Sequence, residues 1–209
     1  DAPFVYTGGL ENHPEIVDRL ARIRPLWGND GACLRGVRNP ERLAEVLENA
    51  GASPPQVRRA ADPPRDPVGW LRKPLRGAGG RGIVPAGHAL VRGRGKNDAT
   101  FYYQRRARGM PCSSLHVASA DGCKLLGATR QLVGERWLHA KRFAWCGSVG
   151  PLSLSARVEE ILRSAGEAAR GAFGLRGCAC SMYAEPIPWA KLLVGVYGPL
   201  GGISPRITA

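Results

Sequence analysis

A lysine followed by a run of glycines is the part of this sequence best suited to chemistry. Residues 70–84 read WLRKPLRGAGGRGIV, so Lys73 precedes a loop rich in glycine and arginine. Glycine reaches positive φ and has no side chain in the way, which lets backbone N–H groups converge on an anion. Lysine and arginine beside such a loop suit phosphate. The pattern predicts a strand, a flexible phosphate-binding turn and a second strand; a surface hairpin with a glycine turn is the alternative.

Two common phosphate-binding motifs do not match this loop. The P-loop requires Gly-Lys-Ser/Thr, which is absent after it. The dinucleotide-binding fingerprint requires a helix, whereas proline and glycine follow here. The function of the loop therefore has to be inferred from the strands and helices around it.

The elements expected around the loop are antiparallel strands and a few helices. Asn39-Pro40 is typical of a helix start, and Gly51 of the end of the same helix. Residues 178–202 lack the clean pattern of a core strand. Further helices are expected at 14–24 and 158–173, strands at 101–104, 114–118, 124–129 and 142–145, and a glycine-rich loop at 88–98.

The charge of the chain is strongly positive. Formal net charge is +13, from 30 basic and 17 acidic residues, so polyanions are the obvious class of partner. Only five basic residues are lysine, and the arginines are spread along the chain. Nucleic-acid recognition needs a clustered stripe, so composition bias explains the charge better and nucleic acid is not the expected partner.

Length and composition limit the class of protein. The 209 residues, 44% of them apolar, allow one substantial core or two small lobes. No apolar run approaches the ~18 residues that span a bilayer, so no membrane association is expected. The six cysteines form no Cys-x-x-Cys pair, which favours free thiols and a cytoplasmic location. The chain begins at Asp1 without a signal peptide, and we expect a fragment that lacks an upstream domain.

The order of these motifs resembles the ATP-grasp superfamily, and most closely its uncharacterised carboxylate–amine ligase-like branch. The glycine loop with Lys73 is similar to the lysine strand and mobile phosphate lid of that family. Residues 102–109 (YYQRRARG) resemble its hinge beside the adenine. The other matching pieces are residues 6–14 (YTGGLENHP), 25–29 (PLWGN), 126–134 (LGATRQLVG) and 204–209 (SPRITA).

The resemblance implies an α+β ATP-grasp fold. In that fold two lobes, each with a mainly antiparallel sheet and packed helices, hold the nucleotide between them. Residues 1–54 would be the tail of a truncated N-terminal domain with connecting helices. Residues 55–103 would form the small lid lobe, and residues 104–209 the large C-terminal lobe.

The resemblance also implies a reaction and its residues. ATP, with Mg²⁺, would phosphorylate a small carboxylate, and an amine would then displace phosphate. Lys73 would bind the α- and β-phosphates, and Arg206 would face the γ-phosphate or the carboxylate. Arg130 is either a second substrate clamp or a solvated strand residue. The lid would consist of Gly77, Gly79, Gly80, Arg81 and Gly82, and the adenine pocket of Gln104, Arg105 and Arg106.

The metal site departs from the family pattern. The Glu-x-Asn-Pro-Arg signature reads GISPR at residues 202–206, and residues 178–183 hold no carboxylate. Mg²⁺ requires hard oxygen ligands, for which Glu185 and Ser204 are weak candidates. The gene is degenerate or carries a reading-frame error across 178–203, or the protein binds nucleotide without catalysis, or Glu185 and backbone oxygens substitute. The functions to be compared are therefore a ligase, a non-catalytic nucleotide-binding pseudo-enzyme and a basic nucleic-acid-binding protein.

Overall fold

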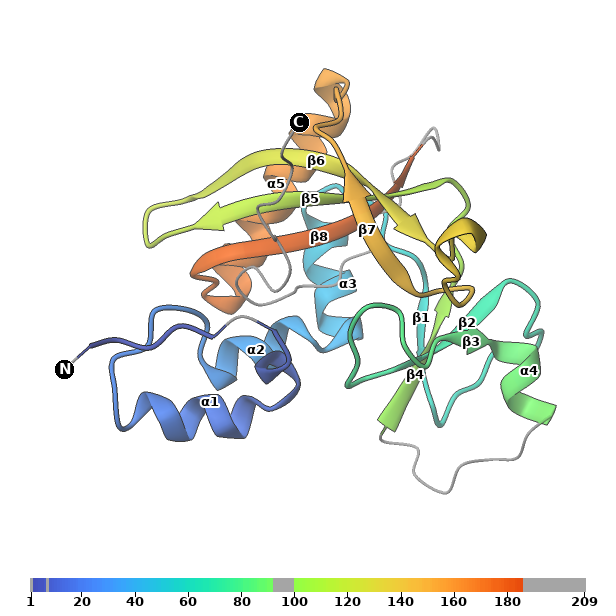
Figure 1. The fold of residues 1–209 in the computed structure, drawn as a ribbon, viewed down its shortest axis with the longest axis horizontal. Helices are drawn as coiled ribbons and strands as arrows, with labels where there is room; N and C mark the ends of the chain where they lie inside the picture. Colours follow the sequence, from blue (N-terminus) through green and yellow to red (C-terminus); the bar gives the residue numbers. More distant parts are fainter. Residues whose placement is uncertain (1, 7, 92–99, 186–209) are drawn as a thin grey trace.

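Two antiparallel sheets with helices around them form the framework of the chain (Figure 1). The computed structural model describes residues 2–6, 8–91 and 100–185. The small sheet has the order β1-β4-β2-β3, and the large sheet the order β7-β6-β5-β8. This arrangement confirms the expected α+β class. The strands are β1 (Val57–Arg59), β2 (Trp70–Pro74), β3 (Val84–Pro85), β4 (Phe101–Arg105), β5 (Met110–Ala118), β6 (Cys123–Val133), β7 (Trp145–Val149) and β8 (Gly177–Glu185).

The helices begin and end where local capping favours it. The Asn39 side chain accepts hydrogen bonds from the backbone N–H groups of Glu41 and Arg42, at 3.1 and 3.2 Å. Gly174 ends the long helix with φ of 68°, a left-handed cap that suits glycine. Among the described residues no helix is long and apolar enough to cross a bilayer. The helices are η1 (Leu10–Asn12), α1 (Pro14–Ala21), α2 (Gly31–Val37), α3 (Pro40–Asn49), α4 (Ala86–Val91), η3 (Arg136–Leu138) and α5 (Ala156–Phe173).

The main core lies between the large sheet and α5, with α2 and α3 at its end (Figure 1). Helix α5 buries Leu162, Ala165, Ala169 and Phe173, which recur at helical spacing and form one apolar face. These side chains pack on Cys112, Leu125 and Ala128 of β5 and β6. Helix α5 thus covers one face of the large sheet, and the periodicity seen at 158–173 is confirmed.

The small sheet presents Lys73 on a defined face. Strand β2 pairs antiparallel with β3 and β4, which confirms the predicted strand–turn–strand. Lys73 lies opposite Tyr102, and Leu71 lies opposite Gln104, so these side chains share one face of the sheet. Trp70 and Tyr103 are buried on the other face, against Ala86 at the start of α4. The register therefore separates a packed face from the face that carries the lysine.

The C-terminal strand corrects one expectation. Residues 177–185 form β8, which pairs with β5 over nine consecutive positions from Gly177 to Glu185. The expectation that residues 178–202 lack a core strand is wrong for this part, while residues 186–202 lie outside the described residues. Pairing with β5 supplies the backbone hydrogen bonds that the local sequence pattern did not predict.

Other boundaries also differ from the sequence-based expectations. Helix α2 and strand β1 were not predicted, and α4 occupies the start of the loop expected at 88–98. Strand β7 begins at Trp145, where the strand expected at 142–145 ends. These elements are short, so tertiary contacts outweigh their weak local signals.

Replacement of glycine by alanine is expected to have opposite effects on stability at two positions of α5. In a helix interior alanine normally stabilises the fold relative to glycine by roughly 0.5–1 kcal/mol. We expect this gain for Gly171→Ala, because nothing lies within 4 Å of its added Cβ. At Gly166 the Cβ would lie 2.5 Å from Nδ1 of His116. His116 is buried and its Nε2 lies 2.9 Å from Ser114 Oγ, so it cannot easily move. Urea denaturation should show Gly166→Ala less stable than the parent; equal gains in both variants would contradict this packing.

Candidate functional site

Lys73 and Gln104 form a polar pair on the face of the small sheet opposite Trp70 and Tyr103. Lys73 Nζ donates a hydrogen bond of 2.9 Å to Gln104 Oε1, and it lies 5.7 Å from the centre of the Tyr102 ring. Gln104 is buried, and Lys73 is half-buried. Desolvation of its ammonium group lowers the pKa of Lys73 to about 8. An anion beside Lys73 would restore the charged form, because an opposite charge nearby favours it.

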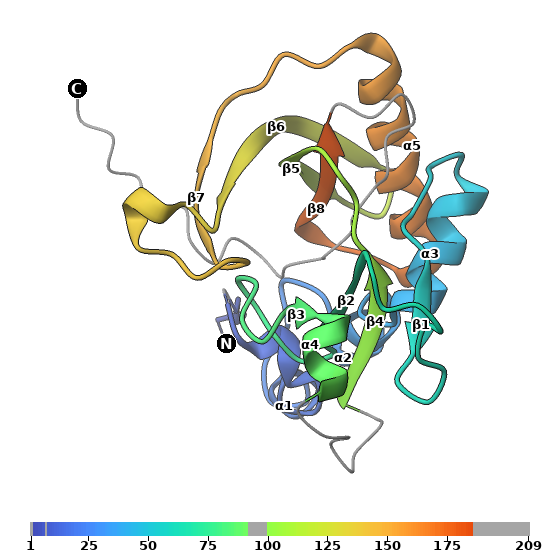
Figure 2. The ribbon, with the colours of Figure 1, turned by 90° about the vertical axis from the view of Figure 1, so that its right-hand side faces the viewer.

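The glycine loop between β2 and β3 reaches across to the large sheet. Gly79, Gly80 and Gly82 have φ of 59°, 76° and 77°, in the left-handed region that favours glycine. Trp145 N donates a 3.0 Å hydrogen bond to Gly79 O. A Cβ on Gly80 would lie 1.8 Å from the carbonyl oxygen of Phe143. The loop therefore contacts the segment that leads into β7 and links the two sheets (Figure 2).

The base of the same loop is held by two residues that sequence reasoning missed. Asn12 Oδ1 accepts hydrogen bonds from Gly77 N at 2.9 Å and from Arg38 Nη2 at 2.7 Å. Arg38 Nη2 also lies 3.2 Å from the carbonyl oxygens of both Leu75 and Gly77. Asn12 lies within the YTGGLENHP stretch, and Arg38 directly precedes the cap of α3. Neither position carries a local signal that points to a loop so distant in sequence.

The side chains of the expected hinge residues Gln104 and Arg105 point to opposite faces of the small sheet. Gln104 points to Lys73, whereas Arg105 lies over the Trp70 ring at 5.8 Å and donates a 3.0 Å hydrogen bond to Val68 O. The backbone N–H of Arg106 donates to Gly69 O at 2.8 Å. The structure thus brings Gln104 to the lysine and places the guanidinium of Arg105 on the opposite, packed face of the sheet.

The remaining predicted residues do not gather at Lys73. Arg81 is exposed on the glycine loop. Arg130 is exposed on β6 and lies opposite Cys112, which is buried on the face that packs against α5. Glu185 is the last residue of β8, opposite Met110. Ser204 and Arg206 lie outside the described residues.

The described residues contain no cluster of three metal-binding side chains. In the part of the chain that the structure describes, no three His, Cys, Asp or Glu side chains come close enough to hold a metal ion. Mg²⁺ at nucleotide sites is usually held by one or two carboxylates together with phosphate oxygens. The side chains described here therefore do not by themselves identify a magnesium ligand.

The geometry does suit a polyphosphate. A desolvated lysine and a loop that reaches positive φ at three glycines belong to one strand–turn–strand unit, which combines an ammonium group with a glycine-rich backbone. Charge-assisted hydrogen bonds from such groups are the strong ones in phosphate binding. The site could thus hold the phosphates of a nucleotide between the two sheets.

Comparisons with known proteins agree with this geometry. A family model of the ATP-grasp domain matches residues 38–181. An ATP-grasp superfamily protein from Archaeoglobus fulgidus has a similar structure, with 16% identity and a TM-score of 0.63 over 90% of this chain and 54% of that one. An L-amino acid ligase from Bacillus licheniformis has 14% sequence identity and a TM-score of 0.65; the match covers 88% of this chain and 46% of that one. A carboxyaminoimidazole ribonucleotide synthase from Aspergillus clavatus, complexed with ATP, has 13% sequence identity and a TM-score of 0.64; the match covers 88% of this chain and 50% of that one.

These matches identify the family of the chain, but the likeness to the solved structures extends to the fold alone. The chain spans about half the length of the three solved structures, and at these identities the likeness concerns the fold. No curated protein matches the sequence. The family model nevertheless covers more than half of the chain, and it includes the lysine strand, the glycine loop and the large sheet up to β8. The resemblance stated from the motifs is thus confirmed, and the chain belongs to the ATP-grasp superfamily.

Proposed function

We propose that this chain is the nucleotide-binding part of an ATP-dependent ligase that joins a small carboxylate to an amine. The observation that carries the proposal is the Lys73–Gln104 pair beside a glycine loop that contacts the large sheet. An L-amino acid ligase and an ATP-bound synthase among the similar structures support it. Lys73 would bind the α- and β-phosphates, and the glycine loop would cover them.

The proposed reaction has two steps. An oxygen of the substrate carboxylate attacks the γ-phosphorus, the bond to the bridging oxygen breaks, and ADP leaves as an acylphosphate forms. The amine nitrogen then attacks the acyl carbon, phosphate leaves, and the nitrogen loses a proton to solvent. The chain itself contributes positioning and positive charge, which are the main needs of phosphoryl transfer. Arg206 remains the proposed contact to the γ-phosphate or the carboxylate.

A non-catalytic nucleotide-binding protein is the second candidate. Residues 178–183, which occupy β8, contain no carboxylate, although this part of the family pattern normally supplies a metal ligand. Positive charge from Lys73 and backbone N–H groups can hold phosphates without a metal, whereas transfer of the γ-phosphate depends on further neutralisation. The two candidates therefore share the nucleotide site and differ in turnover.

Calorimetric titration with ATP, with and without Mg²⁺, separates the two candidates. A ligase should bind ATP more tightly with Mg²⁺ and release ADP when a carboxylate and an amine are both supplied. Binding that ignores Mg²⁺, without ADP release for any acid and amine tested, would favour the non-catalytic protein. Absence of ATP binding under both conditions would exclude both candidates.

A further inference from the structure

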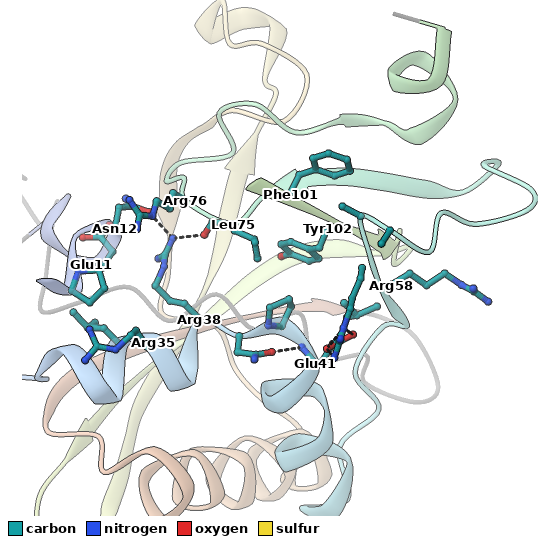
Figure 3. A pocket seen from close by; sticks show the side chains of 18 residues that line it. Glu11, Asn12, Arg35, Arg38, Glu41, Arg58, Leu75, Arg76, Phe101 and Tyr102 are labelled. Atoms are coloured by element: carbon teal, nitrogen blue, oxygen red, sulfur yellow. Dashed lines mark hydrogen bonds and ion pairs between the residues drawn. The ribbon is translucent and has the colours of Figure 1, made fainter. Parts of the chain in front are cut away.

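A cavity lies between the N-terminal helices and the small sheet. Its volume is about 650 Å³, within the range of roughly 300–1,000 Å³ typical of small-molecule sites. Its walls come from η1, α2, the start of α3, β1 and β4, and neither Lys73 nor Gln104 lines it (Figure 3). The cavity therefore borders the proposed nucleotide site, through Arg76 at the start of the glycine loop and Tyr102 beside Lys73, without including the Lys73–Gln104 pair.

We propose that this cavity binds a small zwitterion of the α-amino-acid class, with its ammonium group at Glu11 and its carboxylate at Arg76. The inference goes beyond the proposed ligase function and does not depend on it. It rests on an unsatisfied buried carboxylate, on the pairing of the nearby arginines, and on the apolar walls.

Glu11 is the first of these observations. Its side chain lines the cavity, the residue is only 3% exposed, and its Oε2 atom has no hydrogen-bond partner among the described residues. An ionised carboxylate is costly to bury unless a positive or hydrogen-bonding group compensates it. An ammonium group carries three N–H donors and would supply that missing partner once the Glu11 side chain turns its enclosed Oε2 atom towards the cavity.

The arginines of the cavity wall are the second observation. Arg35 pairs with Asp18, Arg58 with Asp62, and Arg59 with Glu41, at 2.9, 2.8 and 2.7 Å. Three of the five lining arginines are thus neutralised by carboxylates of the protein. Arg38 is engaged at the base of the glycine loop.

Arg76 differs from these arginines. It lines the cavity, it is exposed, and it forms no salt bridge with the described part of the chain, although it acts electrostatically on Glu15. A guanidinium group can bind a carboxylate with two parallel hydrogen bonds. Figure 3 shows Glu11 and Arg76 towards the same side of the view. The proposal places an α-amino acid between them, because its ammonium and carboxylate groups are attached to one carbon.

The rest of the cavity suits an apolar side chain. Leu34, Pro40, Val57, Leu75 and Phe101 contribute to its walls, with Tyr102 beside them. Apolar walls with a few polar groups that fix orientation are the usual design of a small-molecule site. The head group would thus bind at Glu11 and Arg76, and the side chain would extend towards β1 and β4.

Calorimetric titration of the full chain with each of the twenty encoded L-amino acids, without nucleotide, tests the proposal. We expect at least one to bind, and its N-acetyl derivative and its decarboxylated amine to bind much more weakly, because each lacks one charge. Glu11→Gln should weaken the best binder by roughly tenfold or more, and Arg76→Ala should act in the same direction. The matched controls are Glu48→Gln and Arg65→Ala, two exposed positions outside the cavity lining, which should leave binding unchanged.

Thermal unfolding separates ligand binding from a structural role of Glu11. Removal of an uncompensated buried charge should maintain or raise the melting temperature of the ligand-free protein, while Glu11→Gln abolishes the rise that the amino acid causes. Failure of all twenty amino acids to bind, or unchanged affinity in Glu11→Gln, would overturn the proposal. ATP titrations of the same variants report on the ligase proposal separately, because Glu11 is not assigned to the nucleotide.

Discussion

Lys73→Ala is expected to abolish ATP binding, with a loss of at least roughly 100-fold, or about 2.7 kcal/mol. The ammonium group lies on the same face of the small sheet as Gln104, with Nζ 2.9 Å from Gln104 Oε1. Charge-assisted hydrogen bonds to phosphate are strong in a desolvated site, and alanine removes the donor altogether. Titration calorimetry with ATP measures the loss directly.

The pH profile of ATP binding provides a second test of Lys73. Burial lowers its pKa to about 8, and only the protonated form attracts phosphate, so affinity should fall as the pH rises through 8. Lys73→Arg keeps its charge over this range and should remove the pH dependence, even if its affinity is lower. Affinity that stays constant between pH 7 and 9 in the parent protein would contradict this role.

Two controls separate binding from folding. Lys124→Ala removes an exposed lysine from β6 and should leave ATP binding unchanged.

The lowered pKa of Lys73 also affects folding. Between pH 8 and 10.5 the unfolded chain binds more protons than the folded chain, so the free energy of unfolding rises with pH in that window. Lys73→Met relieves this cost of burial and should retain or raise the melting temperature. Parent-like ATP affinity in Lys73→Ala would refute the assignment of this residue.

Gly80→Ala is expected to prevent the glycine loop from contacting the large sheet. Its Cβ would lie 1.8 Å from the carbonyl oxygen of Phe143, and the nearest atoms are backbone, which cannot rotate away. The loop would have to move off the segment that leads into β7. If this contact covers the phosphates, we expect ATP affinity to fall by roughly tenfold or more, as measured by calorimetry.

Gly79→Ala is the matched control for the loop. Both glycines have left-handed φ, 59° and 76°, so alanine carries a similar backbone penalty of roughly 1–2 kcal/mol at each position. Nothing lies within 4 Å of a Cβ at Gly79, so this variant has the strain without the clash. Equal losses of ATP affinity in both variants would indicate that backbone strain, and not contact with Phe143, controls the loop.

The lysine strand and glycine loop were predictable because their signals are local. Apolar residues on both sides of a glycine run predict two strands and a turn, and β2 and β3 pair around that turn. The helix that starts after Asn39 and the one that ends at Gly174 were predictable for the same reason, since a cap depends on neighbouring backbone groups. The order of these motifs was sufficient for the family.

Strand β8 and the N-terminal anchor of the loop were not predictable in the same way. β8 is a strand because β5 offers nine positions of backbone pairing, although its sequence lacks the clean pattern of a core strand. Asn12 and Gly77 are 65 residues apart, yet one amide oxygen joins Gly77 and Arg38. Hydrogen bonds of this kind depend on how distant segments meet, which no window of the sequence contains.

The sequence by itself determined that a basic glycine loop follows a lysine strand and that the chain resembles ATP-grasp proteins. Only the tertiary structure decided which residues accompany that lysine: it selected Gln104, turned Arg105 to the packed face, and left Arg130 on another sheet. It also buried Glu11 beside a cavity, with no hydrogen-bond partner for Oε2 among the described residues. The physical reason is that residue type and spacing define what a side chain can do, whereas strand register and burial define what it meets.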